Sequence, residues 1–116
     1  MDTICLAKKE EVLARLAGDE TLLHEIVQMY FEDYPVLLSH VERAIATNSA
    51  SSLTQAAHDL KGLLSNFSSP KVTAAIQALE QTGKLNQMEN GQTRLEALCR
   101  ELEILSSDLK KWTNQL

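Results

Sequence analysis

The stretch QAAHDLKGLLSNF, Gln55–Phe67, decides the fold because its side chains divide into two opposite stripes. At about 100° per residue, apolar residues spaced by threes and fours lie on one side of an α-helix. A second set at i, i+3, i+4 and i+7 lies on roughly the opposite side. We therefore expect one helix here, with one buried face and one exposed face. The apolar stripe is Leu53, Ala57, Leu60, Leu64 and Phe67, and the exposed stripe is His58, Lys61, Gly62 and Ser65.

The exposed stripe carries an unusual set of side chains for a merely solvated surface. It presents the imidazole of His58, the ammonium of Lys61 one turn later, and Gly62 beside them. A glycine inside an exposed helix costs up to about 1 kcal/mol relative to alanine. Close approach of another molecule to His58 would offset that loss. His58 is therefore the candidate functional residue of the chain.

Length and composition bound the class of protein. The chain has 116 residues and a net charge of −5, so we expect residues 1–116 to form one domain that does not bind nucleic acid. No run approaches the roughly 20 apolar residues of a membrane helix, and the opening MDTICLAKKEE has no signal-peptide pattern. We expect a cytoplasmic protein without membrane insertion. Cys5 and Cys99 have no CxxC or metal-ligand spacing, and we expect reduced thiols.

Helical periodicity continues upstream of the central stretch. A short helix over 4–16 is expected to end at Gly18, a C-cap candidate. Asp19 can cap a long helix over 20–47. Pro35 interrupts this helix and predicts a kink, because proline removes one backbone hydrogen bond.

Downstream, capping signals mark two further helices. The polar run 47–52 is expected to be a loop, with one of its serines capping the central helix. Ser68-Ser69-Pro70 predicts a helix over 70–82 that Gly83 ends. After a loop over 84–91, Asn90 or Gly91 opens a last helix with a bundle-like seam. The seam is Leu95, Leu98, Leu102, Leu105, Leu109, Trp112 and Leu116.

No window alternates as a β-strand does, so the expected fold class is all-α. Short connections place consecutive helices antiparallel. The prediction is an antiparallel four-helix bundle with an additional short N-terminal helix.

Hydrolytic, metal and nucleotide chemistry find no support in the residue pattern. No serine or cysteine has an evident base and orienting acid. No three or four His, Cys or carboxylate residues converge as zinc requires, and no Gly-rich phosphate loop is present. We therefore expect no metal, no cofactor, no ATP site and no autokinase activity. His24 and His40 have no lysine and glycine placed beside them as His58 has, and they are expected to be surface or partly buried residues.

His58-Asp59-Leu60-Lys61-Gly62 resembles the signature of histidine-containing phosphotransfer (HPt) domains of bacterial and fungal phosphorelays. That signature has a lysine three residues after the histidine and a glycine four residues after it. Leu79-Glu80-Gln81-Thr82-Gly83-Lys84 is similar to the end of the family's next helix. The region 16–23, the Pro35 region and the final leucine seam also resemble the family, so the similarity covers nearly the whole chain.

The resemblance implies that His58 accepts a phosphoryl group from an aspartyl phosphate on a receiver domain, or from a sensor histidine kinase, and relays it to another receiver. It also implies that the Glu80 side chain can hydrogen-bond one imidazole nitrogen, and that Lys61 and Lys84 face the phosphate. We expect a monomeric phosphotransfer intermediate rather than an autonomous enzyme. The expected site residues are His58, Lys61 and Gly62, supported by Glu80, Lys84 and Ser65.

Three positions depart from the family pattern. Ser68 stands where a glycine is usual, and Leu63 and Leu64 stand where small residues are preferred. Leu64 fits the apolar stripe, and Leu63 is expected at its rim, where it can contact a partner. Two alternatives remain open. One is a helical interaction module that docks receivers without carrying phosphate. The other is a dimeric four-helix bundle with a purely structural role, which would not explain why residue 62 is a glycine.

Overall fold

The regular elements of the protein are all helical in the computed structural model, which describes residues 9–67 and 69–113. The predicted all-α class is confirmed for these residues. Two 3-10 turns, Ser65–Phe67 and Met88–Asn90, precede α4 and α5. The α-helices are α1 (Lys9–Arg15), α2 (Glu20–Ala46), α3 (Ala50–Leu64), α4 (Pro70–Lys84) and α5 (Gly91–Trp112).

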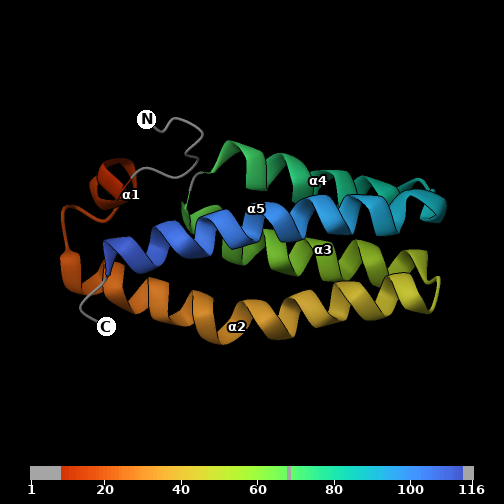
Figure 1. The fold of residues 1–116 in the computed structure, drawn as a ribbon, viewed down its shortest axis with the longest axis horizontal. Helices are drawn as coiled ribbons and strands as arrows, with labels where there is room; N and C mark the ends of the chain where they lie inside the picture. Colours follow the sequence, from red (N-terminus) through yellow and green to blue (C-terminus); the bar gives the residue numbers. More distant parts are fainter. Residues whose placement is uncertain (1–8, 68, 114–116) are drawn as a thin grey trace.

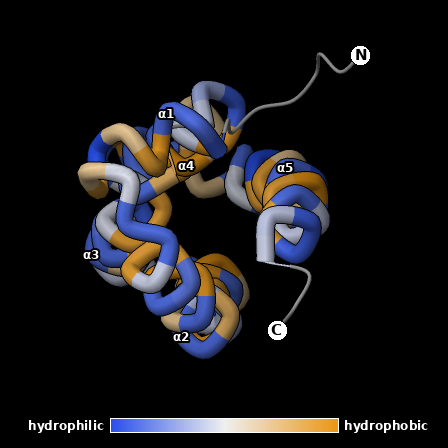
Figure 2. The backbone as a smooth tube through the Cα atoms, turned by 90° about the vertical axis from the view of Figure 1, so that its left-hand side faces the viewer, coloured by the Kyte–Doolittle hydropathy of each residue, from blue (hydrophilic) through white to orange (hydrophobic). Residues whose placement is uncertain are grey.

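The four long helices lie side by side along the length of the molecule, and α1 lies near the end where α2 begins (Figure 1). Consecutive long helices run in opposite directions (Figure 1). Seen end on, α2, α3, α4 and α5 surround a common centre (Figure 2). The helix α3, which carries His58, contacts α2 on one side and α4 on the other. This arrangement agrees with the predicted bundle.

The apolar stripes meet in one core. The stripe that the sequence predicts on α3 is buried along its whole length, down to Phe67, whose ring meets that of Tyr30 edge-on at 5.5 Å between centroids. The α5 seam is buried as far as Leu109, Trp112 is partly buried, and Leu116 lies outside the described residues. Burial of these faces leaves the opposite face of α3 at the surface.

Helix α3 begins earlier than predicted. Its first residue is Ala50, and Ser49 caps it, since the Ser49 hydroxyl accepts a hydrogen bond from the Ser52 backbone N–H at 3.3 Å. The predicted loop over 47–52 is therefore too long, although the expected serine cap is confirmed. Serine is unfavourable inside helices but tolerated in the first turn, where its hydroxyl can serve unpaired amides. Residues 65–67 form a 3-10 turn rather than the end of the α-helix.

Other predicted boundaries are met more closely. Asp19 caps α2 by accepting a hydrogen bond from the Leu22 N–H at 3.0 Å, and Ser69 caps α4 with Pro70 in the first turn. Helix α2 runs through Pro35, and the kink there stays a prediction. The predicted helix over 4–16 is seen from Lys9 onward. Its earlier part, with Cys5, and Ser68 fall outside the described residues.

Three helices end in a left-handed residue that is not glycine. After α1 this residue is Ala17, with φ 57°, and the next residue, Gly18, with φ 76°, donates its N–H to the Leu13 carbonyl at 2.8 Å. Asn48 and Asn86 play the same part after α2 and α4, with φ 55° and 53°. These turns satisfy carbonyls that the helix ends would leave without partners. Gly18 thus belongs to a C-cap, as predicted.

The prediction that Gly83 ends α4 is wrong. Gly83 lies inside α4, which continues to Lys84. A Cβ at position 83 would collide with Thr54 Oγ1 and lie 2.8 Å from the Ala50 carbonyl oxygen. This glycine therefore permits close contact between α4 and the start of α3, and Asn86 provides the turn.

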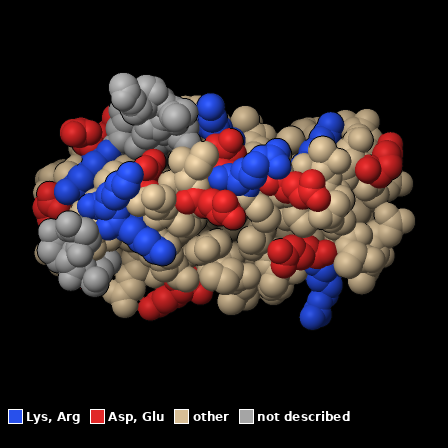
Figure 3. Space-filling model, in the orientation of Figure 1, with Lys and Arg blue, Asp and Glu red and all other residues tan. Residues whose placement is uncertain are grey.

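Charged side chains of both signs alternate over the face shown in Figure 3. Within the described part of the chain, no helix has both the length and the apolar character needed to traverse a lipid bilayer.

Candidate functional site

His58 stands on the outer face of α3. Its side chain is 64% exposed, while the neighbouring core residues Ala57 and Leu60 are fully buried. The imidazole is therefore held by a rigid helix yet open to solvent and to a partner molecule. This is the placement that the two-stripe pattern predicts.

A buried carboxylate from α4 lies at the centre of the groups beside the imidazole. Glu80 is only 7% exposed and gathers three nitrogen-bearing side chains. The Lys61 ammonium donates a hydrogen bond to Glu80 Oε1 at 2.7 Å. Nδ1 of His58 and Nζ of Lys84 lie 3.6 and 3.7 Å from Glu80 Oε2. One carboxylate thus brings the imidazole and both lysines together.

The charge environment keeps this carboxylate ionised. The hydrogen bond from Lys61 is the main cause that lowers the pKa of Glu80, and the positive charges of Lys61 and Lys84 and the nearby His58 act in the same direction. Burial of the carboxyl group acts in the opposite direction and is outweighed. Glu80 is therefore an anion at neutral pH.

Glu80 differs from the role that the family resemblance implies for it. At 3.6 Å, its contact with Nδ1 of His58 is too long for a hydrogen bond, and its short contact is with Lys61. The flexible stem of Lys61, one turn after His58 on the same helix, lets the ammonium reach across to α4. Glu80 thus holds Lys61 beside the imidazole. Nδ1 faces the carboxylate, and Nε2 is the ring nitrogen on the other side.

The spacing of α3 and α4 makes these contacts possible. Gly83 lies three residues after Glu80 on α4, at the point where a Cβ would strike α3. Without a side chain there, the two helices approach closely enough for Glu80 to reach Lys61 and His58. The glycine that the sequence suggested as a helix end is therefore a packing residue that supports the site.

Gly62 has no structural reason to be a glycine. Its φ is not in the left-handed region, and a Cβ at this position would meet nothing within 4 Å. It is exposed and lies one turn after His58. That Gly62 keeps the approach to His58 clear stays a prediction from the sequence.

Ser65 serves the end of the helix. Its hydroxyl donates a hydrogen bond to the Gly62 carbonyl at 2.8 Å, one of the carbonyls that the end of α3 leaves without a helical partner. Ser65 is exposed on the same face as His58. The structure thus joins His58, Lys61, Glu80 and Lys84 directly, and places Gly62 and Ser65 along the same face.

Neither of the other histidines joins this cluster. His24 is partly buried and His40 is exposed, both on α2, as expected. Among the described residues, no group of three or more His, Cys, Asp or Glu side chains is placed to hold a metal ion.

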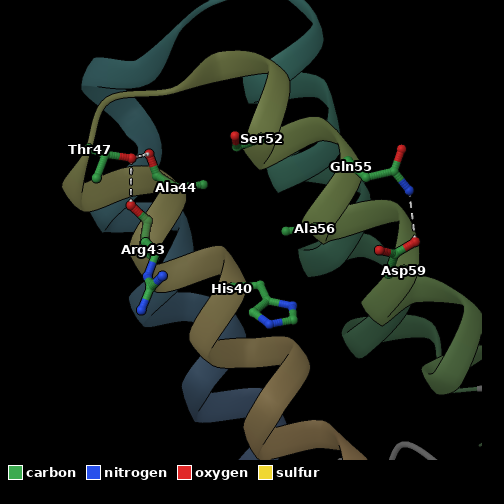
Figure 4. A pocket seen from close by; sticks show the side chains of 8 residues that line it. All are labelled: His40, Arg43, Ala44, Thr47, Ser52, Gln55, Ala56 and Asp59. Atoms are coloured by element: carbon green, nitrogen blue, oxygen red, sulfur yellow. Dashed lines mark hydrogen bonds between the residues drawn. The ribbon is translucent and has the colours of Figure 1, made fainter.

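Sequence reasoning missed a groove beside α3. It has a volume of about 320 Å³ and opens between the C-terminal half of α2 and the N-terminal half of α3 (Figure 4). The spacing of His40 and Arg43 on α2, and of Thr47 directly after its last residue, could have marked a polar face. Only the packing of α2 against α3 shows that this face of α2 and Asp59 of α3, the residue after His58, line the same groove. The groove is lined by His40, Arg43, Ala44, Thr47, Ser52, Gln55, Ala56 and Asp59.

Comparison with known proteins gives one match. The family model for the Hpt domain matches residues 25–111, which span most of α2, all of α3 and α4, and nearly all of α5. No curated protein and no solved structure matches the chain. The match contains every residue of the cluster around Glu80. The chain therefore belongs to the Hpt domain family, whose members carry out histidine phosphotransfer in two-component phosphorelays.

Proposed function

We propose that His58 is the phosphoacceptor of this Hpt domain, which takes a phosphoryl group from the aspartyl phosphate of one receiver domain and passes it to another. The observation that carries the proposal is the exposed imidazole with Lys61, Glu80 and Lys84 gathered on one side of it. A histidine kinase can supply the phosphoryl group in the same way, because the acceptor atom is the same.

In the transfer step, neutral His58 attacks through Nε2. The bond between the aspartyl oxygen and phosphorus breaks as the bond from Nε2 to phosphorus forms, and the receiver's carboxylate leaves with the bonding electrons. Nδ1 keeps its proton and faces the Glu80 carboxylate at 3.6 Å. This distance exceeds that of a hydrogen bond, but the negative charge still favours the tautomer with the proton on Nδ1, which leaves Nε2 free to attack. Transfer to a second receiver is the reverse of this step. The divalent cation and the acidic pocket belong to the receiver.

The lysines supply positive charge to the transferred group. Phosphoryl transfer passes through a loose, metaphosphate-like transition state, so positioning and charge matter more than covalent help. Lys61 and Lys84 already lie beside the imidazole, where Glu80 holds them. Each ammonium can exchange part of its contact with the carboxylate for a phosphoryl oxygen. Exposure of the ring allows the donor to approach in line.

The test is transfer of label from receiver domains of the same organism, phosphorylated with radiolabelled acetyl phosphate. The wild-type protein is expected to acquire an acid-labile, alkali-stable label, and His58→Gln is expected to keep its fold and acquire none. His24→Gln, a histidine outside the cluster, is the matched control and is expected to be labelled. Label on His58→Gln at the wild-type rate would show that another residue is the acceptor. Receiver binding without any label would establish the docking-module alternative instead.

A further inference from the structure

The carboxylate of Glu80 lies beside Nδ1 of His58, the ring nitrogen that does not take the phosphoryl group. We infer that Glu80 keeps a proton on Nδ1 after His58 has been phosphorylated, and that it thereby sets the lifetime of the phosphohistidine. This inference rests on the proposed function. It adds the residue that makes the phosphohistidine a short-lived relay intermediate rather than a stable store of phosphoryl groups.

The proton on Nδ1 decides how easily the phosphoryl group leaves the ring. When an acceptor oxygen attacks phosphorus, the bond between Nε2 and phosphorus breaks and its electron pair goes to Nε2. With a proton on Nδ1 the leaving group is neutral imidazole, and without it the leaving group is an imidazolate anion, which leaves far more slowly. In hydrolysis the acceptor is water, and the products are imidazole and dihydrogen phosphate. Protonation of Nδ1 therefore speeds both transfer to a receiver and hydrolysis.

The two lysines of the site act against this proton. Lys61 stands one turn after His58 on α3, and Nζ of Lys84 lies 3.7 Å from Glu80 Oε2, the oxygen that also faces Nδ1. Nearby positive charges disfavour the protonated, positively charged form of an imidazole. The ammonium groups that attract a phosphoryl group would by themselves drive the proton from the ring.

Glu80 counters the lysines from a position that contacts both partners. Its Oε1 accepts the hydrogen bond of Lys61 at 2.7 Å, and its Oε2 faces Nδ1 of His58 at 3.6 Å. At 3.6 Å the interaction with the ring is one between charges rather than a hydrogen bond. Because the carboxylate is buried, water screens it less than it screens a surface carboxylate.

Phosphorylation makes this interaction stronger. Neutral His58 carries no net charge, whereas a ring with phosphorus on Nε2 and a proton on Nδ1 is a cation. The hydrogen bond from Lys61 lowers the pKa of Glu80, so the carboxylate is negatively charged at the pH where such a ring gains or loses its proton. The structure therefore places a permanent anion beside the nitrogen that becomes cationic.

The other acidic side chain close to His58 in the sequence serves as a comparison. Asp59 lies about 100° around α3 from His58. It is exposed, and it lines the groove between α2 and α3 together with His40 and Arg43. Asp59 thus differs from Glu80 in both direction and burial, although each is a carboxylate near the phosphoacceptor.

The experiment observes the phosphorylated ring without a receiver. Phosphoramidate loads His58: the phosphorus–nitrogen bond of the reagent breaks, ammonia leaves with the electron pair, and Nε2 bonds to phosphorus. The ³¹P NMR shift, followed from about pH 5.5 to 9 across the range in which an imidazole titrates, gives the midpoint of protonation of the phosphohistidine. Decay of the same signal gives its lifetime. His58→Gln, treated in the same way, identifies any signal from other histidines.

Glu80→Gln removes the negative charge and keeps a side chain of the same shape that still accepts a hydrogen bond from Lys61. The midpoint is expected to fall by about one pH unit, the lower end of the effect of a neighbouring charge, because the ring is exposed. Above the midpoint, a tenfold smaller protonated fraction is expected to make the phosphohistidine decay about tenfold more slowly.

Lys61→Ala removes a positive charge and is expected to act in the opposite direction, with a higher midpoint and a shorter lifetime. Opposite signs separate an effect of charge from damage to the cluster, which would change both variants alike. Asp59→Asn is the matched control, because it also removes a carboxylate near His58. Its midpoint is expected to stay within about 0.3 of the wild-type value, since solvent screens an exposed charge.

Two results would overturn the inference while leaving His58 as the phosphoacceptor. In the first, Glu80→Gln has the midpoint of the wild type. In the second, Glu80→Gln and Lys61→Ala move the midpoint in the same direction. If phosphorylated receivers label His58→Gln as they label the wild type, the proposed function itself fails, and the inference on Glu80 fails with it.

Discussion

Gly62 allows a test in which folding stability and phosphotransfer should change in opposite directions. Position 62 has a helical backbone, and an added Cβ would meet nothing within 4 Å. Replacing a glycine in an exposed helix by alanine stabilises a protein by about 1 kcal/mol, which raises the melting temperature of a domain of this size by about 4 °C. Gly62→Ala is therefore expected to be more stable than the wild type.

The rate of phosphotransfer from a receiver is expected to fall as the side chain at position 62 becomes larger. A side chain at position 62 projects into the open approach to His58, and displacing reacting groups by about 1 Å can cost about 100-fold in rate. Gly62→Gln is therefore expected to slow transfer from a phosphorylated receiver by about 100-fold and to leave labelling by phosphoramidate unchanged. Gly62→Ala is expected to fall between the wild type and Gly62→Gln.

The assays are thermal unfolding followed by circular dichroism and transfer of radiolabel from a receiver. Gly83→Ala is the matched control for stability, because its Cβ would strike α3. Overpacking of this kind typically destabilises by about 1–3 kcal/mol. A Gly62→Ala protein that melts below the wild type would show that position 62 has a packing role. A Gly62→Gln protein that accepts label at the wild-type rate would refute the clear-approach argument.

Three further predictions concern charged and buried groups. Lys61→Ala removes the 2.7 Å hydrogen bond to Glu80 and is expected to slow transfer or shorten the lifetime of the phosphohistidine by an amount equivalent to about 1–3 kcal/mol, measured from decay of the label. The lowered pKa of Glu80 stabilises the fold above the unfolded-state value of about 4.3, and this contribution is lost as the pH falls through the folded-state pKa. Urea unfolding of Glu80→Gln is accordingly expected to show a smaller loss of stability on acidification than the wild type, and an equal loss would contradict the prediction. Burial raises the pKa of Tyr30 from 10.0 to about 12. The stability that this group contributes is therefore complete below pH 10 and falls by about 3 kcal/mol as the pH rises to 12. Tyr30→Phe also loses the 2.8 Å hydrogen bond with Ser106, and its unfolding free energy is expected to lack this alkaline loss.

The sequence by itself determined the helices and the face that each of them buries. Spacing by threes and fours is a local property of the chain, so the buried stripe of α3 and the exposure of His58 could both be read from residues 53–67 alone. Capping is local as well, and Asp19 and Ser69 act as predicted. The early start of α3 was missed because residues 47–52 have loop-like composition, and three of them lie in a helical first turn.

Only the tertiary structure decided which side chains meet between helices. The preference of Glu80 for Lys61 over His58 depends on the distance between α3 and α4, which no spacing along the chain encodes. Gly83 looks like a helix end in the sequence because its neighbour α3 is not visible there. The groove likewise exists only where α2 and α3 lie together. Helical periodicity specifies a face, whereas packing specifies what that face touches.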